Sequence, residues 1–183
     1  MLAALAVPTL IRADSHTDLA VSTLSKLRPG QTIEQVKKVI PAGVKLAGPK
    51  WEEFEFAIGN YVRLGGRLNG IVVFLNDAQR RVVKEGKYPD LKPDDPVKRH
   101  HPSDPIEAAI VDLAKVRGKA QTVALIDAVS AKLGKPAKKE YAQHNDENRS
   151  WLAVWKLPGN RTITLSEDNT VHLTATFGTP HQP

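Results

Sequence analysis

The sequence predicts an α+β protein, a tandem duplication of a helix-helix-antiparallel-sheet unit with the helices packed on one sheet face. The first observation is a repeat, because a helix start, a helix face and a strand face recur at a constant offset of 90 residues. The second is that apolar periodicity changes from helical to strand-like within each half. The third is a proline-rich segment between the halves. The matching pairs are Thr32 with Thr122, Ile33 with Val123, Val36 with Ile126, Val39 with Val129, Val73 with Ile163, and Leu75 with Leu165.

The first unit covers residues 18–88. Apolar positions over 18–27 predict a short helix, which Pro29-Gly30 ends. A second helix begins at Thr32, because Gln35 three residues later completes a capping box. The buried face of this helix is predicted to consist of Ile33, Val36, Val39 and Ile40. Strands are predicted to follow over 51–58, 61–64, 71–75 and 81–85, with a hairpin turn at Gly59-Asn60.

The second unit covers residues 105–183 and follows a linker at 89–104, where repeated proline excludes both helix and central strand. It repeats the order of the first unit, with a helix over 106–117 and a second helix that begins at Thr122. Strands are predicted over 139–143, 151–157, 161–165 and 171–177. Since neither half could bury both faces of its sheet alone, helices on one face are the economical arrangement.

Composition limits the classes of function. The net charge is +6, with 12 basic and 7 acidic side chains in residues 18–88 and 10 and 8 in residues 105–183. The first unit is therefore the better candidate for an anionic partner, although so modest an excess is more typical of a solubility feature and does not favour nucleic acid. The chain has no cysteine, which excludes disulfides, thiolate nucleophiles and cysteine-based metal sites.

Residues 1–17 are interpreted as a residual export signal. The apolar run from Leu2 to Ile11 has the length of a signal core and is far too short to span a bilayer. Ile11 and Ala13 could occupy the −3 and −1 positions of a cleavage site before Asp14. No basic residue separates Met1 from the apolar run, so a terminal helix or tail is the alternative. The signal predicts a periplasmic or secreted protein, and a cytoplasmic one stays open.

The helix opening Gly30-x-Thr32-x-x-Gln35-Val36 resembles that of the small outer-membrane-assembly lipoprotein family, SmpA/OmlA. Leu133-Gly134-Lys135-Pro136 in the second unit matches the helix stop of the same family. A tandem pair of such units is similar to the architecture of β-lactamase inhibitory protein. The cysteines that would carry a lipid anchor in the first group or disulfides in the second are absent. The resemblance implies a binding module, because members of both groups act through protein contacts.

The candidate protein-binding residues are aromatic and arginine side chains on the predicted strands. Trp151 and Trp155 lie four residues apart on one strand face, so they are either core residues or the centre of an interface. Tyr61 is the aromatic candidate of the first unit. Arg63 and Arg67, near strand ends, are the polar candidates. The partner expected here is another protein whose identity the sequence does not give.

Candidate catalytic and metal sites carry less weight. Adjacent histidines in an extended chain, such as His100 and His101, point to opposite sides, and a metal would need further ligands. Glu53 and Glu55 share a strand face but lack a second carboxylate across a cleft. No Ser-His-Asp pattern, phosphate loop or HExxH helix is present. We therefore predict no enzyme, cofactor or metal; a module for an anionic polymer and an enzyme with an unrecognised site are the alternatives.

Overall fold

The computed structural model describes residues 8–54, 57–85, 101–143 and 149–177. The elements before the second half are α1 (Pro8–Lys26), α2 (Ile33–Val39), β1 (Val44–Phe54), β2 (Ala57–Gly66), β3 (Gly70–Phe74), α3 (Asp77–Glu85) and β4 (Ile106–Lys115). Those that follow are α4 (Lys119–Leu133), β5 (Lys138–Gln143), β6 (Arg149–Leu157), β7 (Arg161–Glu167) and β8 (Thr170–Phe177). The predicted α+β class is confirmed.

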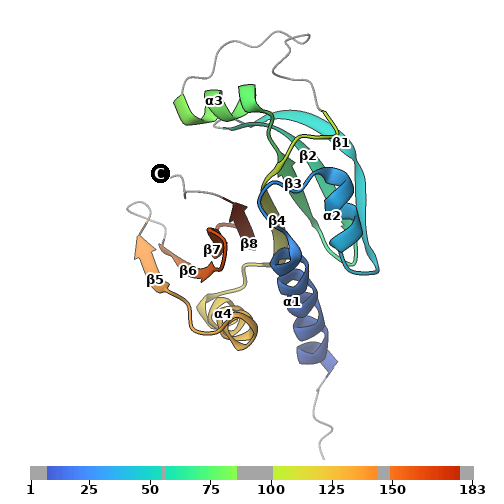
Figure 1. Ribbon diagram of the computed structural model, residues 1–183. Helices are drawn as coiled ribbons and strands as arrows, with labels where there is room; N and C mark the ends of the chain where they lie inside the picture. The colour runs from blue at the N-terminus through green and yellow to red at the C-terminus, as the bar shows by residue number, and fades with distance from the viewer. Residues whose placement is uncertain (1–7, 55–56, 86–100, 144–148, 178–183) are drawn as a thin grey trace, which may run out of the picture.

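All eight strands form one antiparallel sheet in the order β1-β2-β3-β4-β8-β7-β6-β5 (Figure 1). Strands β1 to β4 and β5 to β8 therefore make two meanders that join through their last members. The join consists of seven cross-strand pairs between β4 and β8, from Ala108 with Thr176 to Lys115 with Thr170. Because the sheet is continuous, both halves contribute to the same two faces.

Helices α1, α2 and α4 bury their apolar sides against one face of the sheet, where a single core cluster lies. From α1 this core takes Ala20, Val21, Leu24 and Leu27, and from α2 it takes Ile33 and Val36. Alternate residues of the central strands, such as Val111 on β4 and Leu173 on β8, complete it. Helix α3 instead packs at one end of the sheet against β2 (Figure 1).

The predicted start of the second helix at Thr32 is confirmed. Thr32 is the residue before α2, and its amide donates to Gln35 Oε1 at 2.9 Å, as a capping box requires. The same device explains why the predicted strand over 81–85 is wrong. The amide of Asn76 donates to Gln79 Oε1, and that of Gln79 to Asn76 Oδ1, both at 2.8 Å, so this box begins α3 instead.

The predicted helix over 106–117 is also wrong, because these residues form β4 in the centre of the sheet. A bulge between Ile106 and Ala108 interrupts the alternation, so the buried positions are Ile106, Ala109 and Val111. The buried positions are therefore three and then two residues apart, and with the neighbouring alanines this spacing resembles the buried face of a helix. These residues were predicted to belong to the second unit, yet β4 pairs with β3 of the first half as well as with β8.

The tandem duplication is not confirmed at the helix level, because α4 begins at Lys119 after Gly118 and not at Thr122. The side chain of Gln121 accepts from the amide of Arg117, which lies just before the helix, at 2.8 Å. Thr122 is buried within the first turn. The offset of 90 residues therefore aligns a capping threonine with a core threonine.

The four predicted strands of the second half are confirmed as β5 to β8. The predicted hairpin turn at Gly59-Asn60 is wrong, since both residues lie in β2 and pair with β1. Glu55, Phe56 and most of the predicted linker lie outside the described residues. At the end of that linker, the His101 amide donates to Asp104 Oδ2 at 2.8 Å.

Candidate functional site

The sheet face opposite the core, here called the open face, carries partly exposed side chains from both halves of the chain. Its middle row crosses seven strands through consecutive cross-strand pairs. The middle row consists of Arg63, Ile71, Ile110, Thr174, Thr164, Val154 and Lys138. The five inner members are all β-branched and all partly exposed, whereas the two end members are exposed cations.

A second row lies beside the middle row, on the side of the sheet where α3 packs. It consists of Tyr61, Val73, Ala108, Thr176, Thr162 and Lys156. Together the two rows place four threonines of β7 and β8 in a square at the centre of the open face, since Thr162 pairs with Thr176 and Thr164 with Thr174. The open face is therefore apolar and hydroxyl-rich at its centre, and both rows end in a cation at β5 or β6.

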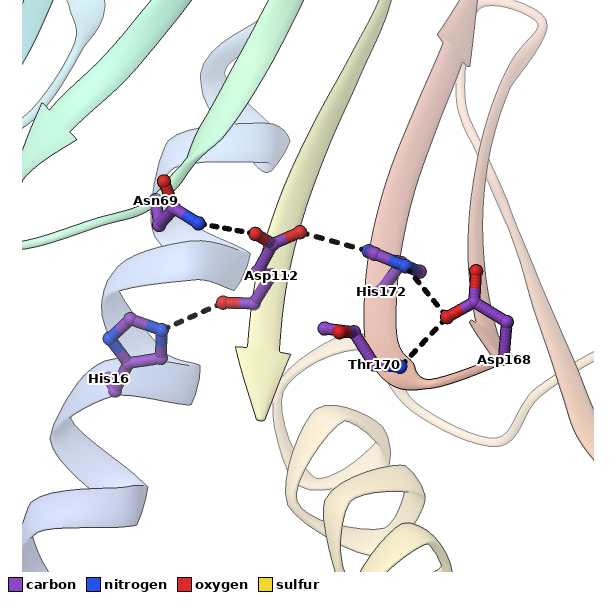
Figure 2. Close-up of polar contacts among 6 residues, drawn as sticks. All are labelled: His16, Asn69, Asp112, Asp168, Thr170 and His172. Atoms are coloured by element: carbon purple, nitrogen blue, oxygen red, sulfur yellow. Dashed lines mark hydrogen bonds and ion pairs between the residues drawn. The ribbon is translucent and has the colours of Figure 1, made fainter. Parts of the chain in front are cut away.

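A third row is polar and begins at Asp112. His172 on β8 pairs with Asp112 on β4 and with Ser166 on β7, and the row continues through Leu152 to Glu140. Figure 2 shows His172 between two carboxylates. Its Nδ1 lies 2.9 Å from Asp112 Oδ1 and its Nε2 lies 3.3 Å from Asp168 Oδ1. Carboxylate oxygens only accept, so a doubly protonated ring satisfies both contacts and a neutral ring satisfies one.

Contacts from two other segments hold Asp112 in place (Figure 2). The side-chain amide of Asn69, between β2 and β3, donates to Asp112 Oδ2, and the Asp112 amide donates to the Asn69 carbonyl at 2.9 Å. On α1, His16 Nε2 donates to the Asp112 carbonyl at 3.0 Å. Asp112 thereby links the first helix, the first meander and the second meander.

Asp168 lies in the turn between β7 and β8 and is largely exposed. The Thr170 amide donates to its Oδ1 at 2.7 Å and closes a short side-chain turn. This hydrogen bond, with the charge and contact of His172, holds the pKa of Asp168 below its ordinary value, although partial burial acts in the opposite direction. The turn therefore favours the ionised carboxylate beside His172.

The polar row does not have the geometry of a nucleophilic triad. Although Asp112, His172 and Ser166 are neighbours, a triad needs the free imidazole nitrogen directed at the hydroxyl. Here His172 Nε2 faces Asp168 instead. Within the described parts of the chain, no group of three or more His, Asp or Glu side chains is placed to hold a metal ion. His101 is exposed, and His100 lies outside the described residues.

The structure separates the five predicted site residues. Trp155 is 1% exposed, and its Nε1 donates to the Gly134 carbonyl at 3.0 Å, so it belongs to the core alternative. Trp151, on the same strand face, is partly buried and packs against that core. Tyr61 is on the open face but 1% exposed. Arg63 is exposed, with its guanidinium carbon 5.8 Å from the Tyr61 ring centre, and Arg67 is exposed just beyond β2.

Trp151 instead forms an aromatic cluster at the β5 edge of the core side. Its ring centre lies 5.2 Å from that of Tyr141, and Lys139 Nζ lies 5.7 Å from it. Its Nε1 is buried without a hydrogen-bond partner among the described residues. The Trp151 amide donates to Glu167 Oε1 at 2.8 Å, while Glu167 Oε2 accepts from the Thr122 hydroxyl at 2.5 Å. Glu167 therefore links Thr122 of α4 to Trp151 of β6.

The capping motif around Thr32 borders a shallow groove of about 430 Å³. Its lining residues are Pro29, Gly30, Gln31, Gln35, Lys38 and Val39. The two glutamine oxygens are already used, because Gln31 Oε1 accepts from the Arg28 amide and Gln35 Oε1 from the Thr32 amide. We therefore assign the motif a structural part in the turn between α1 and α2.

Sequence reasoning missed the inner members of the middle row and the buried Arg161. The signal for the row was present in the alternation Thr162-Ile163-Thr164 and Thr174-Ala175-Thr176, where threonine takes every outward position. Arg161 is 9% exposed and donates to the carbonyls of Ser25 and Leu27 at the end of α1. Burial, followed by the nearby Arg28 charge, lowers the pKa of Arg161.

The fold and the open face define a class: an α+β protein with an eight-stranded antiparallel sheet whose second face remains partly exposed. Comparison with known proteins adds no narrower family, since no family model, curated protein or solved structure matches the chain significantly. None of the helices in the described segments combines the length and apolar character needed to cross a membrane.

Proposed function

We propose that this chain is a non-catalytic protein-binding module of the cell envelope or periplasm, inhibitor-like or assembly-factor-like, that binds its partner across the open face. The observation that carries the proposal is the middle row. Five β-branched side chains from five strands lie in a continuous, partly exposed line with an exposed cation at each end. An apolar centre with a polar rim is the usual composition of a protein interface.

The resemblances support the same class. The sequence around Thr32 resembles the helix opening of the SmpA/OmlA family, and the tandem pair of units predicted from the sequence resembles the architecture of β-lactamase inhibitory protein. Both groups act through protein contacts. The envelope location rests on the interpretation of residues 1–17 as an export signal. The described buried residues of α1 all follow Asp14, so cleavage before Asp14 would leave them in the mature chain.

A photocrosslinking experiment tests the proposal. Benzoylphenylalanine is placed at Thr174, in the centre of the open face, and in a matched control at Ala131, an exposed position on α4. Each full chain is irradiated in an extract of the cell envelope. We expect a discrete adduct from position 174 and none from position 131. Ile110→Arg, which puts a charge in the middle row, should remove the adduct.

Equal crosslinking from both positions, or an adduct unaffected by Ile110→Arg, would overturn the proposal. A thermal melt of each variant belongs to the experiment, because loss of the adduct counts only for a folded chain. The alternatives give other outcomes. An anionic polymer would be bound with a steep dependence on salt, and substrate turnover in the extract would indicate an enzyme.

A further inference from the structure

Positive and negative side chains are distributed unevenly over the open face. The middle and second rows contain three cations, Arg63, Lys138 and Lys156, and no carboxylate. Glu107, at the β4 bulge beside the second row, forms an ion pair with Arg80 at 3.2 Å. The acidic side chains of the third row are partnered as well. Asp112 contacts His172 and Asn69, while Glu140 forms an ion pair with Lys138 at 2.7 Å. The cations without a carboxylate among the described side chains are therefore Arg63 and Lys156.

These two cations are held at opposite sides of the apolar centre. Arg63 is on β2 and Lys156 on β6, which are five strand steps apart in the sheet. At about 4.8 Å a step, their backbones are separated by roughly 24 Å. The guanidinium carbon of Arg63 lies 5.8 Å from the centre of the Tyr61 ring, a cation–π contact that favours this direction of the side chain on the face. Thus no small ligand can contact both cations and the centre at once.

We infer that the partner is a folded protein with an apolar contact patch flanked by carboxylates, which meet Arg63 on one side and Lys156 on the other. This inference rests on the proposed function and deepens it. Complementary charge at the rim of an apolar interface speeds association and fixes the orientation of the partner. A polyanion is disfavoured because only partly exposed Ile, Val, Ala and Thr side chains lie between the two cations, whereas a phosphate backbone needs a continuous series of positive contacts.

The test uses the Thr174 crosslinking chain in the envelope extract, with charge reversals added. Arg63→Glu and Lys156→Glu each change an unpaired cation of the open face. Lys135→Glu is the matched control, because it makes the same change in net charge at an exposed position after α4. We expect each open-face reversal to lower the yield of adduct about tenfold at low salt, and the control to leave it within about twofold.

The adducted protein, once purified, is then titrated with the same variants at low and moderate salt. The inference expects the difference between Arg63→Glu and Lys135→Glu to shrink as salt rises, because screening weakens exposed pairs. If Ile110→Arg removes binding while the reversals behave like the control, the charge assignment is wrong and the proposed function stands. If Ile110→Arg has no effect, the proposed function itself is wrong. Self-association of the chain through position 174, or capture of nucleic acid, would also overturn the inference.

Discussion

Replacing Trp155 with alanine tests which face of the sheet is the core, on which the assignment of the open face depends. The side chain is 1% exposed, and an aromatic of this size buries about 150–250 Å². At about 25 cal/mol per Å², this area corresponds to roughly 4–6 kcal/mol as an upper limit. Loss of the hydrogen bond to the Gly134 carbonyl adds about 1 kcal/mol. Large-to-small core changes cost about 3–5 kcal/mol, so we expect a loss near 4 kcal/mol.

The measurement is the free energy of unfolding in urea at 25 °C, followed by far-ultraviolet circular dichroism. Trp155→Phe is the matched control, since it keeps an aromatic ring and removes Nε1, and should lose only about 1–2 kcal/mol. Trp151→Ala should fall between them, at about 2 kcal/mol, because that side chain is only partly buried. A loss below about 1 kcal/mol for Trp155→Ala would refute the reasoning, since Trp155 would then not be part of a packed core.

Three further predictions follow from neighbouring positions and from the ends of the chain. Ile110→Arg should change the free energy of unfolding by about 1 kcal/mol or less, whereas Val111→Arg, one residue later on the buried side, should prevent folding; equal urea midpoints would contradict this. Because the Thr170 amide and the neighbouring histidine lower the pKa of Asp168, its stabilising contribution is present above the ordinary Asp value of about 3.9 and is lost as pH falls through the lowered value. Asp168→Asn should therefore flatten the pH dependence of the melting temperature between about pH 5 and pH 2, and an unchanged slope would contradict it. If residues 1–13 are an export signal, sequencing of the native protein should find Asp14 first, and an intact segment on cytoplasmic protein would reject this interpretation.

Sequence reasoning predicted best where local signals and tertiary structure agree. Buried and partly exposed residues alternate regularly along β7 and β8, because the pairing of these two strands contains no bulge. The period of two in the sequence therefore matches the structure. The capping box at Thr32 is likewise local, because its hydrogen bond joins Thr32 to Gln35, three residues later. Elements of this kind can be predicted from a few neighbouring residues.

The wrong predictions concern residues whose conformation depends on their position in the sheet. The central position of β4 between β3 and β8 overrides an alanine-rich sequence with helical spacing, and two bulges conceal its period. The residues of the middle row were missed for a related reason. Arg63 and Lys138 are 75 positions apart in the sequence, and only the strand order places them at two ends of one row. Trp155 was predicted as a candidate binding residue because it is large and aromatic, but its side chain is buried in the core.

The join between β4 and β8 has a consequence for how the chain is made. The last strand of the sequence lies in the middle of the sheet, paired with β4 on one side and β7 on the other. A ribosome needs roughly 3–12 s to add the residues between the end of β4 and the end of β8. During that interval the first meander would present β4 as an unprotected edge, which can pair with another nascent chain. A premature stop before β8 would therefore divide the sheet in two, and a chaperone that shields an exposed strand would act on this chain before release.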